Sequence, residues 1–148
     1  MELYISVAST VLALFSVAVS LVTYSRTVAH NRKKDTLDAY NTLQEQAFDK
    51  LNLIMPKEIA EIAKHPSSPD YKKLSGYLAR IEHFCVGVNK GIYDRKTVYA
   101  LAHGYLDGNQ ILSRILPLIE RRNQNSEDFY KNIKFVLGWM REKAGAEK

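Results

Sequence analysis

Hydrophobic and polar positions divide the chain into an uninterrupted apolar stretch at its start and a longer region of mixed character after it. Residues 3–25 contain no charged side chain, whereas Glu2 precedes them and Arg26 follows them. A helix of this length extends about 35 Å, which is enough to cross a hydrocarbon core of about 30 Å. The pattern therefore predicts a transmembrane helix over residues 1–25.

Two other interpretations of the apolar stretch are weaker. A cleavable signal peptide begins with basic residues and has a shorter apolar core. Ala18-Val19-Ser20 imitates a cleavage site, but the first 25 residues contain no Lys or Arg. A buried core helix seldom runs past about 20 residues without a charge. Membrane insertion is therefore the interpretation that we adopt.

The charges beside the apolar stretch predict its orientation. A basic juxtamembrane segment over residues 26–34 follows it, whereas the α-amine and Glu2 precede it. Because basic residues are retained on the cytoplasmic side, we expect a single-pass protein of the inner membrane with its N-terminus outside and its C-terminal domain in the cytoplasm. The basic side chains would also contact lipid headgroups of the bilayer. They are Arg26, Arg32, Lys33 and Lys34.

Small side chains form a stripe along one face of the apolar stretch, at alternating spacings of three and four residues. Small residues let two membrane helices approach closely, and hydroxyl groups can bond between them. The stripe therefore predicts a packing face, used either for a homo-oligomer or for another membrane helix. Chance in a segment rich in Ser and Ala is an equally good explanation. The stripe comprises Ser6, Ser9, Ala13, Ser16, Ser20 and Thr23.

Apolar residues at helical spacing continue beyond the basic segment. Residues 35–55 show this spacing from Leu37 to Met55, and no Gly or Pro occurs before Pro56. The membrane helix either continues into this segment as one rod or breaks near residues 30–34, and the sequence leaves both alternatives open. Pro56 ends or kinks the helix because it lacks an amide hydrogen.

Further helices are predicted after the loop at residues 65–70. We expect Ser68 to cap the next helix and Gly91 to end it. Asp94 is expected to cap a following helix, and Ser126 to open the last one. Apolar residues recur at helical spacing throughout these segments.

The predicted fold class is all-α, because no alternating run flanked by hairpin turns occurs in the sequence. One N-terminal transmembrane helix is followed by a small cytoplasmic bundle of antiparallel helices over residues 35–143. Residues 144–148 are expected to form a flexible tail.

Composition narrows the classes of function. The chain carries 21 basic and 16 acidic residues, a net charge of +5. The basic residues are scattered among acids without a dense stripe, so no nucleic-acid partner is expected. The single Cys85 excludes an internal disulfide, and its place within an apolar helical stripe identifies it as a packed thiol.

Motifs that would carry chemistry are absent from the sequence. His83 and Cys85 are two residues apart and therefore point to different sides of a helix, which argues against a metal site. No P-loop, dinucleotide fingerprint or nucleophile elbow occurs. We therefore expect no enzymatic activity, no cofactor, no metal and no small-molecule substrate.

One segment carries a resemblance to a known family. Residues 77–88 contain the pattern Leu-x-x-Ile-Glu-x-x-x-x-Gly, and residues 91–94 read Gly-Ile-Tyr-Asp. Over most of residues 30–142 the chain resembles a bacterial family of single-pass membrane proteins, whose helical cytoplasmic region is a domain of unknown function. The resemblance supports an all-α cytoplasmic region behind one membrane helix.

The same resemblance implies a contact for one carboxylate of this segment. Glu82 would form an internal ion pair with Arg114 or Arg121. We interpret this pair as a contact that holds the fold together, although buried ionic groups also mark functional sites.

Two functional classes remain. The first, which we prefer, is a protein-interaction or regulatory module at the cytoplasmic face of the bacterial inner membrane that presents a groove or a helix face to a protein partner. The alternative is a prophage-type exclusion or toxicity factor that perturbs the membrane through the same helix. Only the stripe of small residues supports the alternative.

Overall fold

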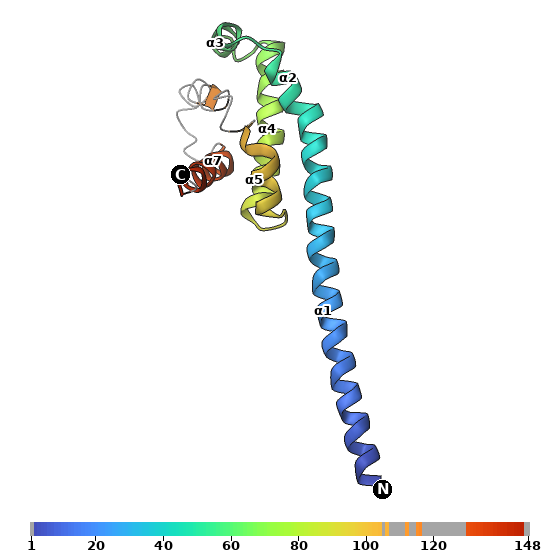
Figure 1. Cartoon of the computed structure of the whole chain (residues 1–148). Helices are drawn as coiled ribbons and strands as arrows, with labels where there is room; N and C mark the ends of the chain where they lie inside the picture. Colours follow the sequence, from blue (N-terminus) through green and yellow to red (C-terminus); the bar gives the residue numbers. More distant parts are fainter. Residues whose placement is uncertain (1, 105, 107–111, 113–114, 117–129, 147–148) are drawn as a thin grey trace.

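The computed structural model describes residues 2–104, 106, 112, 115–116 and 130–146. The described residues form helices and no strands, so the predicted all-α class is confirmed. Figure 1 shows one long helix whose N-terminal half extends alone and whose C-terminal half carries a group of shorter helices.

The long helix α1 (Glu2–Leu43) is continuous through the basic segment, so the alternative of a break near residues 30–34 is wrong. No Gly or Pro interrupts its hydrogen-bond ladder. A π-helical turn, η1 (Gln44–Phe48), follows directly and leads into α2 (Asp49–Asn52). In this turn the amide of Asp49 donates to the carbonyl oxygen of Gln44, five residues back, which inserts one residue into the turn and shifts the face that α2 presents.

Caps and breakers fix the next three helices. Pro56 is the first residue of α3 (Pro56–Lys64), and the amide of Met55 before it donates to Glu58 Oε2 at 2.9 Å. α4 (Pro69–Asn89) begins at Pro69, where the predicted cap is confirmed: Ser68 Oγ accepts from the Tyr71 amide at 3.1 Å. These local signals therefore act at the predicted positions.

The end of α4 and the start of α5 (Arg95–His103) are also as predicted. Gly91 has φ 71°, a left-handed conformation that favours glycine, and it follows the last turn of α4. Asp94 caps α5 by accepting from the Thr97 amide at 2.9 Å.

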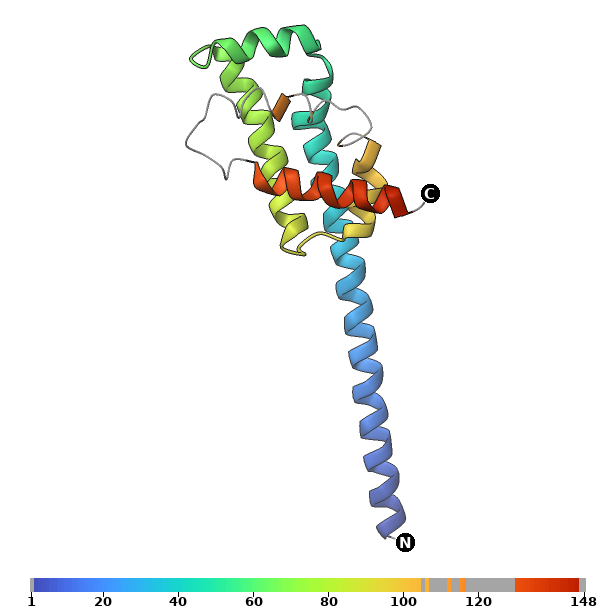
Figure 2. The same ribbon diagram turned by 90° about the vertical axis from the view of Figure 1, so that its left-hand side faces the viewer.

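The helices pack as a small bundle around α4. α4 runs back along the C-terminal part of α1, and α5 turns to pack against α1 (Figure 1). α7 (Lys131–Ala146) lies across α4 at a steep angle, as Figure 2 shows. The bundle therefore packs against only the C-terminal part of α1.

The core consists largely of the predicted stripes. The helical stripes of α4 and α7 are buried, as expected; they comprise Leu74, Leu78, Ile81, Cys85 and Val88 of α4 and Ile133, Val136, Leu137 and Met140 of α7. Leu37 and Met55, at the two ends of the apolar pattern over residues 35–55, are 42% and 67% exposed. Thr36, next to Leu37, is fully buried instead, and Met55 lies beyond the end of α2.

The last helix begins later than predicted. α7 starts at Lys131, and Tyr130 before it has φ 57°, which is incompatible with a helix. Ser126, which we predicted to open this helix, lies outside the described residues, as do Arg114 and Arg121.

Candidate functional site

The apolar half of α1 carries most of the exposed large hydrophobic side chains among the described residues. The most apolar 18-residue window of the helix has a mean hydropathy of 1.6, and none of it is buried. It is the one helix in the described part of the chain that is long and apolar enough to cross a membrane. The exposed apolar side chains include Val11, Leu12, Leu14, Phe15, Val17, Val19, Leu21 and Val22.

Hydroxyl groups along this half bond to their own helix. Ser16 Oγ donates to the Leu12 carbonyl at 2.9 Å, and Ser20 Oγ donates to the Ser16 carbonyl at 2.8 Å. These bonds satisfy the hydroxyl donors without a partner from outside the helix. The hydroxyl groups are therefore compatible with an apolar environment.

The predicted stripe of small residues lies on a surface that no other part of the described chain covers. Ala13, Ser16, Ser20 and Thr23 are exposed, as are the basic residues that follow them. The side chains of Ser6 and Ser9 lie outside the described part of the structure. The stripe thus stays a predicted packing face.

The basic residues of the juxtamembrane segment continue the same helix. Arg26, Arg32, Lys33 and Lys34 are all exposed on α1, between its apolar half and the bundle. Their place on α1 is the one that the sequence predicts for residues at the edge of a membrane-spanning segment.

Glu82, on α4, forms the cap of α7. Its Oε1 accepts from the backbone amide of Asn132 at 3.2 Å and from the Asn132 side-chain amide at 2.7 Å. Its Oε2 accepts from the amide of Ile133 at 2.9 Å. Asn89, which follows Glu82 by seven residues on α4, donates to Asn132 Oδ1 at 2.9 Å. A carboxylate at a helix N-terminus is stabilised both by these donors and by the helix dipole.

The predicted partners of Glu82, Arg114 and Arg121, lie outside the described residues. The sequence placed Glu82 and Asn89 on one edge of α4 but did not identify Asn132 as the residue that meets both. The role that Glu82 has in the described structure is structural: it fixes the start of α7 to the middle of α4.

Tyr130 makes the turn into α7 possible. Its ring is buried, and burial raises the pKa of its phenol above the ordinary value, while a hydrogen bond with Ser75 acts in the opposite direction. The left-handed backbone of Tyr130 is strained for a residue with a side chain. The packing of its ring on α4 and the cap of Glu82 together hold this conformation.

The turn between α4 and α5 folds back onto α4. The amides of Ile92 and Tyr93 both donate to the Gly87 carbonyl, at 2.9 and 3.3 Å. The Tyr93 ring stacks on Phe84 with centroids 5.0 Å apart. These contacts explain physically why Gly87 and the sequence Gly-Ile-Tyr-Asp occur together in one segment.

Thr36 ties this turn to α1, and sequence reasoning missed it. Its Oγ1 donates to the Arg32 carbonyl and accepts from the Asp94 amide at 2.8 Å. Thr36 lies four residues before Tyr40 and seven before Leu43, so the same helical spacing that identified those residues would have found it. Its polar side chain obscured the signal.

Replacing Thr36 by Val should lower the free energy of unfolding by about 1–2 kcal/mol, because the partly buried amide of Asp94 loses its acceptor while the shape of the side chain is kept. Thr42→Val is the matched control. Thr42 makes the same bond to a carbonyl four residues back, but it is exposed and has no second partner among the described residues. Thermal unfolding of the full chain in detergent should separate the two variants. Equal midpoints would contradict the role given to Thr36.

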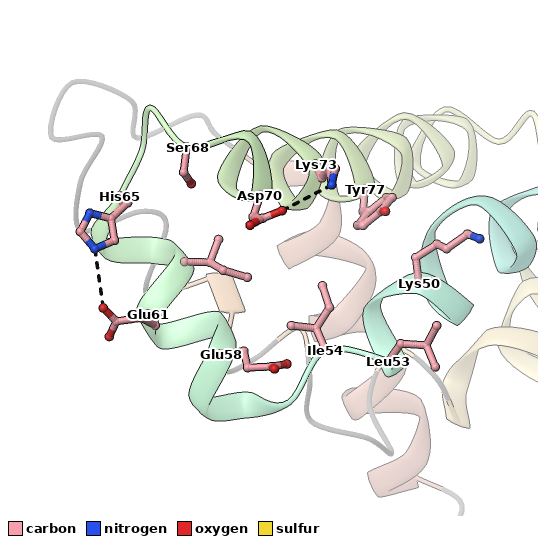
Figure 3. A pocket seen from close by; sticks show the side chains of 11 residues that line it. Lys50, Leu53, Ile54, Glu58, Glu61, His65, Ser68, Asp70, Lys73 and Tyr77 are labelled. Carbon is pink, nitrogen blue, oxygen red and sulfur yellow. Dashed lines mark hydrogen bonds and ion pairs between the residues drawn. The ribbon is translucent and has the colours of Figure 1, made fainter.

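A groove lies between α2, α3 and α4, at the end of the bundle opposite the α4–α5 turn. It has a volume of about 660 Å³. Figure 3 shows side chains from all three helices directed toward it, with ion pairs along its rim. Glu61 bonds to Lys64 at 2.6 Å, which lowers the pKa of its carboxyl, and Asp70 lies 3.4 Å from Lys73. Apolar side chains line it as well: Leu53, Ile54, Ile62 and Tyr77.

This groove combines both charges with apolar surface. Leu53 is 80% exposed although it is a large aliphatic residue. A mixed lining of this kind suits a peptide or protein surface better than a small rigid ligand, which requires a more enclosed and more apolar pocket. Sequence reasoning did not predict the groove, because it forms between segments whose relative placement no local pattern specifies.

Clusters of metal-binding side chains are not present among the described residues. Cys85 is fully buried, and burial together with the nearby charge of Glu82 raises the pKa of its thiol. His83, two residues earlier, is exposed on the other side of α4. The predicted packed thiol is confirmed.

Cys85 should therefore react with thiol reagents only after unfolding. We expect no labelling of the folded full chain by a disulfide reagent and complete labelling in denaturant, because the buried thiol is both inaccessible and protonated. Absorbance of the released chromophore measures this. Rapid reaction of the folded chain would contradict the packing described here.

Comparison with known proteins gives one match. The model of a family described as Domain of unknown function (DUF4760) matches residues 4–137. Searches among curated proteins and among solved structures found no match.

Proposed function

The chain belongs to the DUF4760 family, and we propose that this member is a single-pass membrane protein whose helical domain is an interaction or regulatory module at the cytoplasmic face of the bacterial inner membrane. The observation that carries the proposal is the uncovered apolar half of α1. An apolar surface of this extent is unfavourable in water and favourable in lipid.

The continuity of α1 supports the membrane part of the proposal. The apolar half and the half that contributes Tyr40 and Leu43 to the bundle core belong to one helix. The exposed basic residues between the two halves favour a cytoplasmic bundle through the positive-inside rule. A rigid helix would then hold the bundle at a fixed height above the bilayer.

The groove between α2, α3 and α4 is the surface that we assign to a protein partner. It lies at the end of the bundle farthest from the apolar half of α1 (Figure 1). A partner in the cytoplasm would therefore reach it without contact with the bilayer. The exposed side chain of Leu53 is the apolar anchor that a partner would cover.

Two measurements test this proposal. Carbonate extraction should leave the full chain in the membrane pellet, and tags at the two ends should place only the C-terminus in the cytoplasm. Release into the supernatant or the reverse orientation would refute the membrane assignment.

The partner surface is tested with a photo-cross-linking residue at Leu53. We expect a discrete cross-linked product in intact cells, and none from the same residue at Phe135, which is exposed on the outer face of α7. Equal products at the two positions, or none at Leu53, would argue against the groove.

The stripe of small residues predicts self-association or pairing of the membrane helix. Changing Ser9, Ala13 and Ser16 together to Leu should abolish association in a membrane two-hybrid assay, because larger side chains separate the helices. Val11→Leu with Val22→Leu, on the opposite face of α1, is the matched control and should leave the signal unchanged. An unchanged signal in the first variant would count against the packing face.

A further inference from the structure

The turn between α4 and α5 lies at the end of the bundle from which the apolar half of α1 extends (Figures 1 and 2). The hydrogen bond from the Asp94 amide to Thr36 fixes its height on α1. Thr36 follows the apolar stretch by 11 residues, counted from Ser25, a rise of about 16 Å along the helix. The headgroup region extends about 5–7 Å beyond the hydrocarbon core on each side. A turn that projects from Thr36 toward the apolar half therefore approaches the headgroups.

Basic side chains from three elements gather at this turn. A hollow of about 420 Å³ is lined by four basic side chains and one carboxylate. Arg32 comes from α1, Lys90 from the end of α4, and Arg95 and Lys96 from the start of α5, with Asp94 as the one acid. Hydrogen bonds from Thr97 lower the pKa of the Asp94 carboxyl, and Lys33 lies near enough to lower it further. The hollow therefore has an excess of positive charge.

The charged groups at the turn differ in how they are used. Asp94 is occupied by Thr97, whose amide and hydroxyl both donate to its Oδ2. Arg95 donates to the Asn89 carbonyl at 3.4 Å and lies over the rings of α7, so its side chain is held in place. Lys90 and Lys96 are exposed and take part in none of the ion pairs formed within the described residues. These two lysines are thus available to an external anion.

An apolar side chain lies between these lysines. Ile92 follows Gly91 at the tip of the turn and is 61% exposed. An exposed aliphatic residue flanked by basic residues is typical of segments that rest on an anionic membrane, where the charges contact phosphate groups and the apolar side chain enters the interface.

We propose that the α4–α5 turn is a second membrane contact, in which Arg32, Lys90 and Lys96 bind anionic phospholipid headgroups and Ile92 enters the interface. This inference rests on the proposed function, since it requires α1 to span the same bilayer. The juxtamembrane segment of α1 makes the first contact with the membrane. The turn adds another, although its Asp94 is 58 residues away from Thr36 in the sequence. Two contacts fix the tilt of the bundle and direct the groove of α2, α3 and α4 into the cytoplasm.

The test uses the full chain with Ile92→Cys, labelled with an environment-sensitive fluorophore and reconstituted into vesicles. The unmodified chain serves as the blank, because Cys85 is fully buried. In vesicles of phosphatidylglycerol and phosphatidylethanolamine, we expect a blue-shifted emission that brominated lipids quench. In phosphatidylcholine vesicles we expect emission typical of water. The same label on Leu53→Cys, at the far end of the bundle, should report water in both.

Charge substitutions give the quantitative part of the test. In phosphatidylglycerol vesicles, some chains have the turn bound to the membrane and others do not. Lys90→Gln and Lys96→Gln should each reduce the ratio of bound to unbound turns by about fivefold. Lys50→Gln with Lys73→Gln, which changes two lysines of the groove, is the matched control and should leave the ratio unchanged.

The outcomes separate this inference from the proposed function. Release of the chain by carbonate would overturn both. A chain that resists carbonate but keeps its Ile92 label in water with phosphatidylglycerol would overturn the second contact alone. The same holds if the label enters both kinds of vesicle equally. A shift produced by inorganic phosphate with phosphatidylcholine vesicles would overturn the assignment to lipid.

Discussion

Replacing Glu82 by Ala should lower the free energy of unfolding by about 3 kcal/mol and release α7 from the bundle. The Glu82 carboxylate accepts hydrogen bonds from two backbone amides and one side-chain amide at the start of α7. Without it these donors lose their acceptor in a partly buried setting, and the N-terminus of α7 loses a charge that complements its dipole. The effect is large because one residue serves three donors.

The single tryptophan of the chain makes the effect measurable. Trp139 lies on α7 and packs edge-on against Tyr99 of α5, with ring centroids 6.1 Å apart. Its fluorescence in the full chain, held in a mild detergent, should change at a lower denaturant concentration in Glu82→Ala. Glu82→Gln keeps one carbonyl acceptor and should recover part of the loss. His83→Ala, at an exposed neighbouring position, is the matched control.

The interpretation of Glu82 fails if its replacement costs no more than the control. Surface substitutions usually change stability by no more than about 0.5 kcal/mol. A Glu82→Ala variant within that range would mean that the amides of Asn132 and Ile133 find acceptors elsewhere.

Helix starts and ends were predictable from the sequence because their signals are local. Ser68 and Asp94 cap the helices that follow them, and Gly91 has the left-handed backbone that was expected after α4. Each of these features depends on a few neighbouring residues. The same is true of the apolar half of α1, whose length and lack of charge can be counted directly.

Features that depend on the placement of distant segments were not predictable. The inward face of α1 includes Thr36 rather than Leu37, since Asp94 of a distant turn needs an acceptor at that position. The π-helical turn at Gln44–Phe48 changes the helical register after α1, so a single period could not describe residues 35–55. Met55, the last residue of that single period, is exposed.

The candidate sites show the same division. The sequence located the membrane-proximal charges of α1, because they are adjacent along the chain. The sequence did not indicate that Lys90 and Lys96 lie close to these charges, because only the fold brings them to the same hollow as Arg32. It also recognised that the carboxylate of Glu82 needs a partner, but the amides that serve it in the described structure come from a segment about 50 residues away.

Replacing Gly87 by Ala should destabilise the chain by about 2 kcal/mol, although Ala favours helices over Gly by about 1 kcal/mol. Gly87 lies inside α4, and a Cβ atom there would collide with Cε2 and Cδ2 of the Tyr93 ring. The ring cannot move aside without cost, because it stacks on Phe84 and its own backbone is bonded to the Gly87 carbonyl. The steric term therefore outweighs the gain in helix propensity.

The same helix supplies the matched control. Gly76 also lies within α4, but nothing lies within 4 Å of a Cβ atom placed on it. Gly76→Ala should therefore stabilise the chain by about 0.5–1 kcal/mol. Opposite signs for the two substitutions, measured by thermal unfolding of the full chain in detergent, would identify contact with the ring as the cause.

A double-mutant cycle tests that cause directly. If the Tyr93 ring opposes the new methyl group, Gly87→Ala should cost nothing, or stabilise slightly, in a Tyr93→Ala background. The coupling between the two positions should then reach about 2 kcal/mol, within the range found for residues in contact. A loss from Gly87→Ala that persists without the ring would instead locate the constraint in the backbone of the α4–α5 turn. The pairing of a glycine in α4 with Gly-Ile-Tyr-Asp in this sequence would then need another explanation.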